Sequence, residues 1–275
     1  MSALKWVGGK KQLLNTLENK FPTKIKTFYE PFGGSLTVTL YVLENLEVDN
    51  IVVSDINSKL VNFYNQAKKN VEKLIEKVET FVEEDYYDCR KIFNETTDPL
   101  EQGALFFYLN KKCFNGLYRV NKKGGYNVPI GRTNVNWENN FNNLRSFSKK
   151  IKSKKIKIEN LSYTSFFEKY IKNISEDDLV YLDPPYYDTF VSYDGHGFST
   201  DDQTNLCEIC SKLECHVVAS NSNTEFIKNL YEKNNFEIEE IDAYRHINSD
   251  ATKRGKQPVE VIAHLKKRPE VLVQQ

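Results

Sequence analysis

The feature that most constrains the fold is an apolar segment that enters a glycine turn and is followed by a second apolar segment ending in an acid. Residues 27–30 are expected to form a buried strand that leads into Pro-Phe-Gly-Gly at 31–34, and Ser35 is suited to cap the next helix. Residues 50–54 predict a second strand, which Asp55 follows. The pattern is typical of a βαβ unit, so we expect an α/β fold.

This turn favours a nucleotide-like ligand. Glycine lets a ligand approach the backbone closely, and the following helix offers free N–H groups at the positive end of its dipole. Asp55 is placed to accept both hydroxyls of a ribose. Nucleotides, dinucleotides and S-adenosylmethionine (SAM) all suit this layout, and a tight turn can also use glycine for steric reasons alone. No Gly-Lys-Ser/Thr follows the turn, which argues against a P-loop.

The rest of the chain predicts that the α/β domain is split by a mostly helical insertion. Residues 58–112 place apolar side chains three and four positions apart, and 113–134 are loop- or hairpin-like and rich in Gly and Asn. The α/β alternation resumes at 155–159. Further strands are expected at 179–182, 216–220, 236–241 and 259–265, and helices at 201–213 and 224–234.

Charge is unevenly distributed, although 38 Lys and Arg balance 38 Asp and Glu. Residues 110–157 hold 13 basic residues and one acid, which favours a face that contacts phosphates. A solvated lysine-rich surface would give the same count. Apolar runs fall short of the ~20 residues of a membrane span, the N-terminus has no secretory signal, and five cysteines are too few and too unevenly spaced for a disulfide framework. We expect reduced thiols, no membrane contact, and a cytoplasmic location or one with the DNA of a virus-infected cell.

A second motif, Asp183-Pro184-Pro185-Tyr186, follows the strand predicted at 179–182. The prolines hold the backbone extended and rigid at the sheet edge where α/β proteins bind ligands. The Asp183 carboxylate and the Pro184 carbonyl can accept hydrogen bonds from an exocyclic amine, and the Tyr186 ring can stack on its base. A rigid strand-ending turn is the structural alternative. The glycine turn upstream favours the catalytic interpretation.

Six motifs occur in the order found in the DNA adenine methylase (Dam) family, the α-class or D12-class adenine-N6 DNA methyltransferases. The resemblance extends from about residue 4 to about residue 265. It rests on Lys5-Trp6-Val7-Gly8-Gly9-Lys10, Glu30-Pro31-Phe32-Gly33-Gly34, Ser54-Asp55-Ile56-Asn57, Asn115-Gly116-Leu117-Tyr118-Arg119-Val120-Asn121, Asn127-Val128-Pro129-Ile130-Gly131-Arg132 and Asp183-Pro184-Pro185-Tyr186.

The resemblance implies a Rossmann-like SAM-dependent methyltransferase domain with an inserted DNA-recognition domain that carries a β-hairpin. It assigns 1–56 and 155–275 to SAM binding and catalysis. Residues 57–154 become the target-recognition domain, with helices at about 58–112 and the hairpin loop at about 113–134. Duplex DNA is the expected partner. The enzyme is expected to be a monomer in solution, with more than one copy able to share a DNA molecule.

Site residues also follow from the resemblance. Lys10 matches the contact to the methionine carboxylate, Asp55 the ribose acid, and Asp183 a contact to both cofactor and target. Two positions depart from the family, Leu36 at the second glycine and Ser162 at an acid near the SAM adenine, and both bear on cofactor affinity more than on chemistry. The expected cofactor contacts are Trp6, Lys10, Phe32, Gly34, Asp55, Tyr163 and Asp183.

The implied reaction is direct methyl transfer to an adenine flipped out of the duplex, with Asp183, Pro184 and Tyr186 as catalytic residues and no metal. The Arg119 fork suits guanine O6 and N7, and Arg132 suits a phosphate. Lys5, Leu117, Arg119 and Pro129 are the residue types that GATC-specific relatives use, and Phe114-Asn115 resemble a pair inserted near the flipped base. The expected DNA contacts are Lys5, Phe114, Asn115, Leu117, Arg119, Asn121, Pro129 and Arg132.

Several alternatives remain open. One alternative is a cytosine-N4 methyltransferase, although those enzymes usually carry Ser or Asn in place of Asp183. The non-enzymatic alternative is a relative that binds DNA but has lost catalysis. The chain could act alone, in a restriction–modification pair or in a virus. His196 is expected in a loop that covers the substrate. The cysteines at 207, 210 and 215, with His216, could bind zinc, but packing inside an amphipathic helix is favoured.

Overall fold

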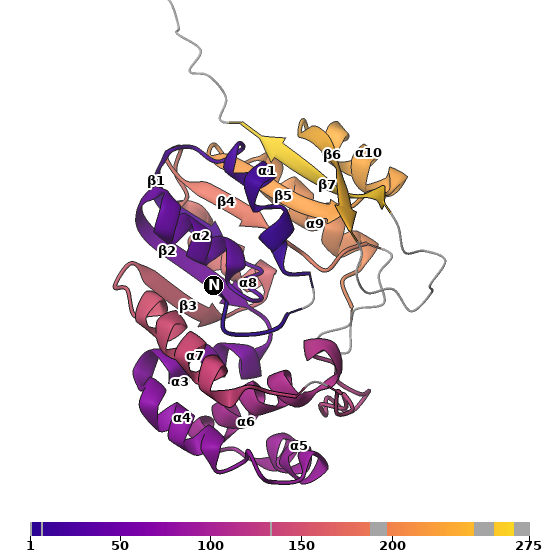
Figure 1. Cartoon of the computed structure of the whole chain (residues 1–275). Coiled ribbons are helices and arrows are strands. Elements are labelled where there is room, and N and C mark those ends of the chain that lie inside the picture. The colour runs from indigo at the N-terminus through magenta and orange to yellow at the C-terminus, as the bar shows by residue number, and fades with distance from the viewer. Residues whose placement is uncertain (1, 7, 133, 188–196, 245–255, 267–275) are drawn as a thin grey trace, which may run out of the picture.

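The computed structural model describes residues 2–6, 8–132, 134–187, 197–244 and 256–266 (Figure 1). Helices and strands alternate along most of the chain. In order they are η1 (Lys10–Gln12), α1 (Leu14–Glu18), β1 (Lys24–Glu30), α2 (Thr37–Asn45), β2 (Glu47–Asp55), α3 (Ser58–Lys69), α4 (Val71–Glu79), α5 (Tyr86–Glu95), α6 (Pro99–Lys112), η2 (Phe114–Gly116), α7 (Trp137–Ile151), β3 (Ile156–Asn160), α8 (Tyr163–Tyr170), η3 (Ile171–Asn173), β4 (Leu179–Leu182), α9 (Thr200–Ser211), β5 (His216–Ser222), α10 (Glu225–Lys233), β6 (Glu237–Tyr244) and β7 (Lys256–Leu265).

Within the described residues, the strands form one seven-stranded sheet in the order β3-β2-β1-β4-β5-β7-β6. The strands from β3 to β5 are parallel, and β7 runs antiparallel to both β5 and β6. The chain moves outward from β1 to β2 and β3, then returns to β4 on the other side of β1. The predicted α/β fold is confirmed, and the strand order reverses between β1 and β4, where such sheets bind ligands.

Alternating side chains of the strands supply two separate cores. In β4, Leu179 and Tyr181 pack in the cluster that includes α2 and α3, whereas Val180 and Leu182 pack with α8, α9 and α10. Helices therefore cover both faces of the sheet, as Figure 1 shows. Strand β4 contains four apolar residues, all buried, because a central parallel strand is covered on both sides.

Between β2 and β3 the chain leaves the sheet and forms helices α3 to α7, which lie together below it in Figure 1. Their buried apolar side chains join the same core cluster as those of β1 and β2. Helix α7 was not predicted, although its apolar residues recur at helical spacing between polar and basic ones. Asn136 caps it, and its buried face carries Phe141, Leu144, Phe147 and Ile151.

The structure corrects two further details of the predicted elements. Ser35 does not cap the helix after the glycine turn, because α2 begins at Thr37 with Leu36 at its N-cap. The Ser35 hydroxyl instead lies 2.8 Å from that of Thr37. Helix α8 was also unforeseen, and Ser162 is its N-cap. No helix of the described residues is both long and apolar enough to span a bilayer.

We predict that replacing His264 of β7 makes the protein less sensitive to acid. His264 is 5% exposed, neither of its ring nitrogens has a hydrogen-bond partner among the described residues, and burial beside His216 lowers its pKa from 6.5 to about 4. As pH falls from 6.5 towards 4, the unfolded chain binds a proton that the native state excludes. The contribution of His264 to the free energy of unfolding then falls by about 1.4 kcal/mol for each unit that the pH drops in this range.

Urea unfolding of wild type and His264→Leu at several pH values between 7 and 4.5 measures this contribution. As the pH is lowered, the unfolding free energy of wild type should fall more steeply than that of His264→Leu. Parallel pH profiles would show that His264 takes up its proton as readily in the native state as in the unfolded chain.

Candidate active site

Three neighbouring strands end at one edge of the sheet and bring the predicted motifs together. Strand β1 ends at Glu30, β2 at Asp55, and β4 at Leu182, after which Asp183 follows. Because β1 lies between β2 and β4, the glycine turn after β1 sits between the two acids. The sheet topology therefore places the cofactor motif and the Asp-Pro-Pro-Tyr motif side by side.

The turn after β1 fits glycine for steric reasons that the structure makes explicit. A Cβ on Gly33 would lie 2.4 Å from the Val53 side chain, and Gly34 has a left-handed φ of +45°. Leu36, at the position where the family has its second glycine, also has a positive φ of 58°. A leucine rarely adopts this conformation. The departure from the family pattern therefore retains the glycine-like backbone.

Asp55 is held by the turn next to it. Its two carboxylate oxygens accept hydrogen bonds from the backbone N–H groups of Gly34, at 2.9 Å, and Asn57, at 2.8 Å. Burial raises the pKa of Asp55 above 3.8, and these two donors oppose the rise. Each oxygen keeps a second lone pair, which can accept from a ligand hydroxyl. Ile56, which sequence reasoning did not assign, is 51% exposed beside this acid.

Aromatic rings line the other side of the glycine turn. Phe32 stacks on Tyr163 with 6.1 Å between ring centroids, and Phe198 contacts both rings edge-on. The Tyr163 hydroxyl lies 3.0 Å from an oxygen of Asp202 on α9. Trp6 also lies against the turn, since its indole is 3.3 Å from a Cβ built on Gly34. Four predicted cofactor residues thus surround the turn: Trp6, Phe32, Gly34 and Tyr163.

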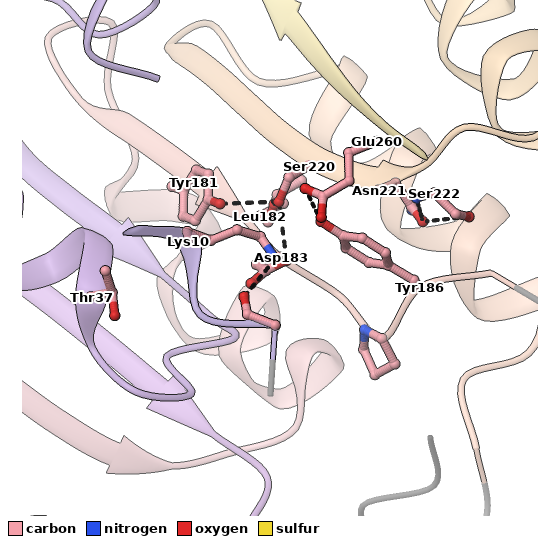
Figure 2. Close-up of polar contacts among 12 residues, drawn as sticks. Lys10, Thr37, Tyr181, Leu182, Asp183, Tyr186, Ser220, Asn221, Ser222 and Glu260 are labelled. Carbon is pink, nitrogen blue, oxygen red and sulfur yellow. Dashed lines mark hydrogen bonds and ion pairs between the residues drawn. The ribbon is translucent and has the colours of Figure 1, made fainter. Parts of the chain in front are cut away.

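Asp183 is the centre of a buried polar cluster at the end of β4 (Figure 2). Lys10 Nζ lies 2.9 Å from its Oδ1, and the Ser220 hydroxyl donates to the same oxygen at 3.0 Å. The Tyr181 hydroxyl lies 3.0 Å from that of Ser220. Burial raises the pKa of Asp183 above 3.8, and the Lys10 ammonium opposes the rise. Burial would lower the pKa of Lys10, but the charge of Asp183 prevails and raises it.

Two features of this cluster add to the sequence interpretation. Lys10 is predicted to contact a methionine carboxylate, and in this structure its side chain, 5% exposed, binds Asp183 and also donates to the Gly8 carbonyl at 2.8 Å. Ser220 was predicted only as a strand residue, and no local motif marks it. It reaches Asp183 because β5 is paired in parallel with β4.

Tyr186 is held from two sides. Its hydroxyl donates to Glu260 of β7 at 2.9 Å, and Lys10 Nζ lies 4.6 Å from the centre of its ring. Figure 2 shows this ring beside Asp183. Glu260 was not predicted as a site residue. It lies 74 residues from Tyr186 in the sequence and reaches it only because β7 pairs with β5.

The predicted DNA-contacting hairpin has a short antiparallel pairing. Cys113 pairs with Ile130, and Val120 with Tyr126. Arg119 is exposed, and its Nε donates to the Asn127 side chain at 2.8 Å, which fixes the plane of the guanidinium.

Helix α5 supports the far strand of this hairpin. Asn94 bonds both the N–H and the carbonyl of Tyr126, at 2.8 and 3.1 Å. Tyr86 and Arg90 both donate to the carbonyl of Val128, at 2.9 and 3.2 Å.

The tip and flanks of the hairpin hold the remaining predicted DNA contacts. The Asn121 side-chain oxygen accepts from Lys123 and Gly125 in the turn, at 2.9 and 3.1 Å. Phe114 is 48% exposed, and Asn115 has a φ of 54°. Exposed or half-exposed at the same hairpin are Leu117, Pro129 and Arg132.

Lys5 is fixed next to the hairpin by α6. The side chain of Asn110 accepts from the Lys5 N–H at 3.0 Å and donates to its carbonyl at 2.7 Å. A Cβ on Gly116 would lie 2.3 Å from that of Lys5. The buried ammonium of Lys111 bonds the Ala3 carbonyl at 2.5 Å. The segment that carries Lys5, Trp6 and Lys10 therefore links the hairpin to the Asp183 cluster.

The possible zinc cluster does not form a set of ligands. Cys207 and Cys210 are buried in α9, and Cys207 Sγ lies 3.8 Å from the Leu230 carbonyl. Within the part of the chain that the structure describes, no group of three or more His, Cys, Asp or Glu side chains could hold a metal ion. His196, predicted in a substrate-covering loop, lies outside the described residues.

The family model for D12 class N6 adenine-specific DNA methyltransferases matches residues 6–247. The chain belongs to this family. Type II methyltransferase M.MjaIII of Methanocaldococcus jannaschii is 36% identical, over 91% of this chain and 94% of that protein. The DNA adenine methylase of Haemophilus influenzae is 31% identical, over 92% and 90%. A solved precorrin-6y C5,15-methyltransferase from Geobacter metallireducens aligns with a TM-score of 0.43 and 10% identity over 97% of this chain and 93% of that chain.

Membership of this family makes the chain an adenine-specific DNA methyltransferase, with DNA as its substrate and SAM as the implied methyl donor. The cytosine-N4 alternative is thereby set aside. The predicted resemblance to DNA adenine methylases is confirmed.

We predict that Asp55→Ala weakens SAM binding and leaves DNA binding intact. Loss of a half-buried acceptor for two ribose hydroxyls should cost on the order of 1–3 kcal/mol, or roughly five- to 150-fold in Kd. Isothermal titration with SAM measures the change. Asp49→Ala, at the exposed start of the same strand, is the matched control. An unaltered SAM affinity in Asp55→Ala would place the ribose elsewhere.

Proposed function

We propose that this D12-class enzyme methylates adenine N6 within GATC in duplex DNA, with SAM as donor, after flipping the adenine out of the helix. The observation that carries the proposal is the Asp183 cluster, which lies at the switch point of the sheet beside the glycine turn. The proposal also assigns residues 57–154 to target recognition, supported by the exposed Arg119 and Arg132 on the hairpin.

The residues around the turn fit SAM. Phe32, Tyr163 and the exposed Ile56 offer flat or apolar surfaces for an adenine, and Asp55 offers acceptors for ribose hydroxyls. Ser162 stands where the family often has an acid near the SAM adenine. Its hydroxyl caps α8 and does not supply the carboxylate of that acid. When bound, SAM supplies a methyl group on a positively charged sulfur.

The chain's own residues activate the nucleophile by hydrogen bonding. The lone pair of an adenine amino group is delocalised into the ring, so acceptors on its N–H bonds pull the nitrogen towards a pyramidal geometry and localise the pair. Among the described residues, Lys10 and Ser220 both bind Oδ1 of Asp183, so Oδ2 can accept one N–H. The Pro184 carbonyl accepts the other. Because these groups are preorganised at a buried site, they lose little energy to reorganisation.

Tyr186 holds the flipped base in this proposal. Its ring is fixed by Glu260 and Lys10, so one ring face can stack on the adenine without an ordering cost at the moment of binding. After the transfer the methylated nitrogen is positively charged and loses one of its N–H protons. Asp183, the nearest carboxylate of the cluster, can accept this proton and pass it to solvent.

Substitution of Asp183 tests the mechanism. We expect Asp183→Ala to lower the rate of methyl transfer to a GATC duplex by about a hundredfold or more, because the main acceptor for the amino group is gone. Labelled-methyl incorporation gives the rate, and circular dichroism checks the fold. Asp177→Ala, exposed just before the same strand, is the matched control. Turnover like that of wild type in Asp183→Ala would contradict the mechanism and leave open a protein that only binds DNA.

Substitution of Arg119 tests the sequence specificity. If Arg119 binds guanine through two hydrogen bonds, Arg119→Ala should lose roughly 1–3 kcal/mol of discrimination at one base pair. Methylation should then spread to sites that differ from GATC at that guanine. Arg132→Ala, as loss of a phosphate contact, should weaken binding to all sequences alike and reduce the salt slope by about one.

Both arginine variants are compared on duplexes with each single substitution in GATC, at two salt concentrations. An even loss of activity at every site in Arg119→Ala, with its preference unchanged, would show that Arg119 contacts the DNA backbone. The GATC assignment would then lose its main support.

A further inference from the structure

Helix α9 carries a buried amide that contacts the Asp-Pro-Pro-Tyr motif. Gln203 is 2% exposed, and its Nε2 donates to the Pro185 carbonyl at 2.9 Å. Its Oε1 accepts from the side chain of Asn221, also at 2.9 Å. Asn221 is fully buried, and its Oδ1 accepts from the backbone N–H of Tyr187 at 3.3 Å and of Ser222 at 2.8 Å. Figure 2 shows the Asn221–Ser222 contact near Tyr186.

Backbone chemistry fixes the direction of this hydrogen-bond chain. The N–H groups of Tyr187 and Ser222 can only donate, so the oxygen of Asn221 must face them and its nitrogen must face Gln203. The oxygen of Gln203 then accepts, and its nitrogen is left facing the Pro185 carbonyl, which can only accept. Both amides therefore have a single satisfied orientation.

The two ends of the chain hold the two peptide planes on either side of Tyr186. Gln203 binds the carbonyl of the Pro185–Tyr186 peptide, and Asn221 binds the N–H of the Tyr186–Tyr187 peptide. Ser222 adds a bond to the Tyr187 carbonyl at 2.9 Å. Fixing both planes fixes φ and ψ of Tyr186, and with them the direction in which its side chain leaves the backbone.

We propose that Gln203 is a positioning residue for methyl transfer, which acts by aiming the Tyr186 ring at the target base. The proposal rests on the proposed function, in which Tyr186 stacks on the adenine. Gln203 acts from the backbone side of Tyr186, and Glu260 acts at its hydroxyl. Loss of the Gln203 bond should therefore lower kcat, whereas SAM affinity should stay unchanged.

A glutamate at this position makes the role measurable through pH. When protonated, Glu at 203 can donate its O–H to the Pro185 carbonyl and still accept from Asn221. When ionised it can only accept, so it repels that carbonyl. Burial raises the pKa of such an acid, as it does for Glu30, also 2% exposed, whose pKa is raised to about 8. The ratio of Gln203→Glu to wild-type kcat should therefore fall as pH rises from 6 to 9.

Gln203→Met removes the donor at every pH. Its kcat should therefore be about tenfold below that of wild type, and the ratio of the two kcat values should not change with pH. Asn234→Asp is the matched control, because it also converts an amide into an acid. It too loses a hydrogen bond to a backbone carbonyl, since Asn234 at the end of α10 donates to the carbonyl of Leu230 at 2.9 Å. Its kcat ratio to wild type should stay near one at every pH.

The assay measures kcat and the SAM KM for the four proteins between pH 6 and 9 on a GATC duplex with adenine at the target position. A second duplex with 2-aminopurine at that position, which lacks the N6 amino group and is not methylated, reports by fluorescence how the flipped base is stacked. Wild-type kcat in Gln203→Met together with a flat pH ratio in Gln203→Glu would overturn the positioning role and leave the proposed function standing. If Gln203→Glu does not fold, Asn221→Asp breaks the next link of the chain and gives the same comparison. A wild-type protein that transfers no methyl group would overturn both proposals.

Discussion

The ion pair between Lys10 and Asp183 is the contact on which the rest of the site depends. The two side chains are only 5% and 21% exposed and lie 2.9 Å apart, so either charge alone would cost several kcal/mol to keep out of water. The pair therefore holds the N-terminal segment against the end of β4. The same segment places Trp6 beside the glycine turn and Lys5 beside the hairpin, where Asn110 fixes its backbone. One buried contact thus joins the elements proposed for cofactor binding, catalysis and recognition.

The parallel sheet explains why residues that are far apart in sequence meet at this ion pair. Strand β1 lies between β2 and β4, which brings Asp55 and Asp183 to either side of one turn. Strands β5 and β7 then supply Ser220 to the Asp183 carboxylate and Glu260 to the Tyr186 hydroxyl. Helix α9 completes the enclosure, because neighbouring residues on it hold Tyr163 and the Pro185 carbonyl. The site therefore depends on the ends of elements, whose positions the packed sheet determines.

The sequence was sufficient for the strands and the motifs, because apolar runs and turn residues are local signals. Strand β4 matches its predicted bounds, and the glycine turn and Asp55 lie as expected. Contacts between distant elements had no local signal. Ser220, Glu260 and Gln203 meet the motif only through strand pairing and helix packing, and the ion pair of Lys10 with Asp183 likewise joins residues far apart in the sequence. Helix α7 was not predicted, because the Asn, Ser and Lys residues between its apolar positions weaken the periodic signal.

The most direct test of the account is a crystal structure of the protein with S-adenosylhomocysteine and a GATC duplex. The account predicts an adenine outside the helix, stacked on Tyr186, with N6 within about 3 Å of Asp183 Oδ2 and of the Pro184 carbonyl. An adenine that stays paired in the duplex, or an N6 that faces other residues, would contradict the claim that the Asp183 cluster activates the amino group.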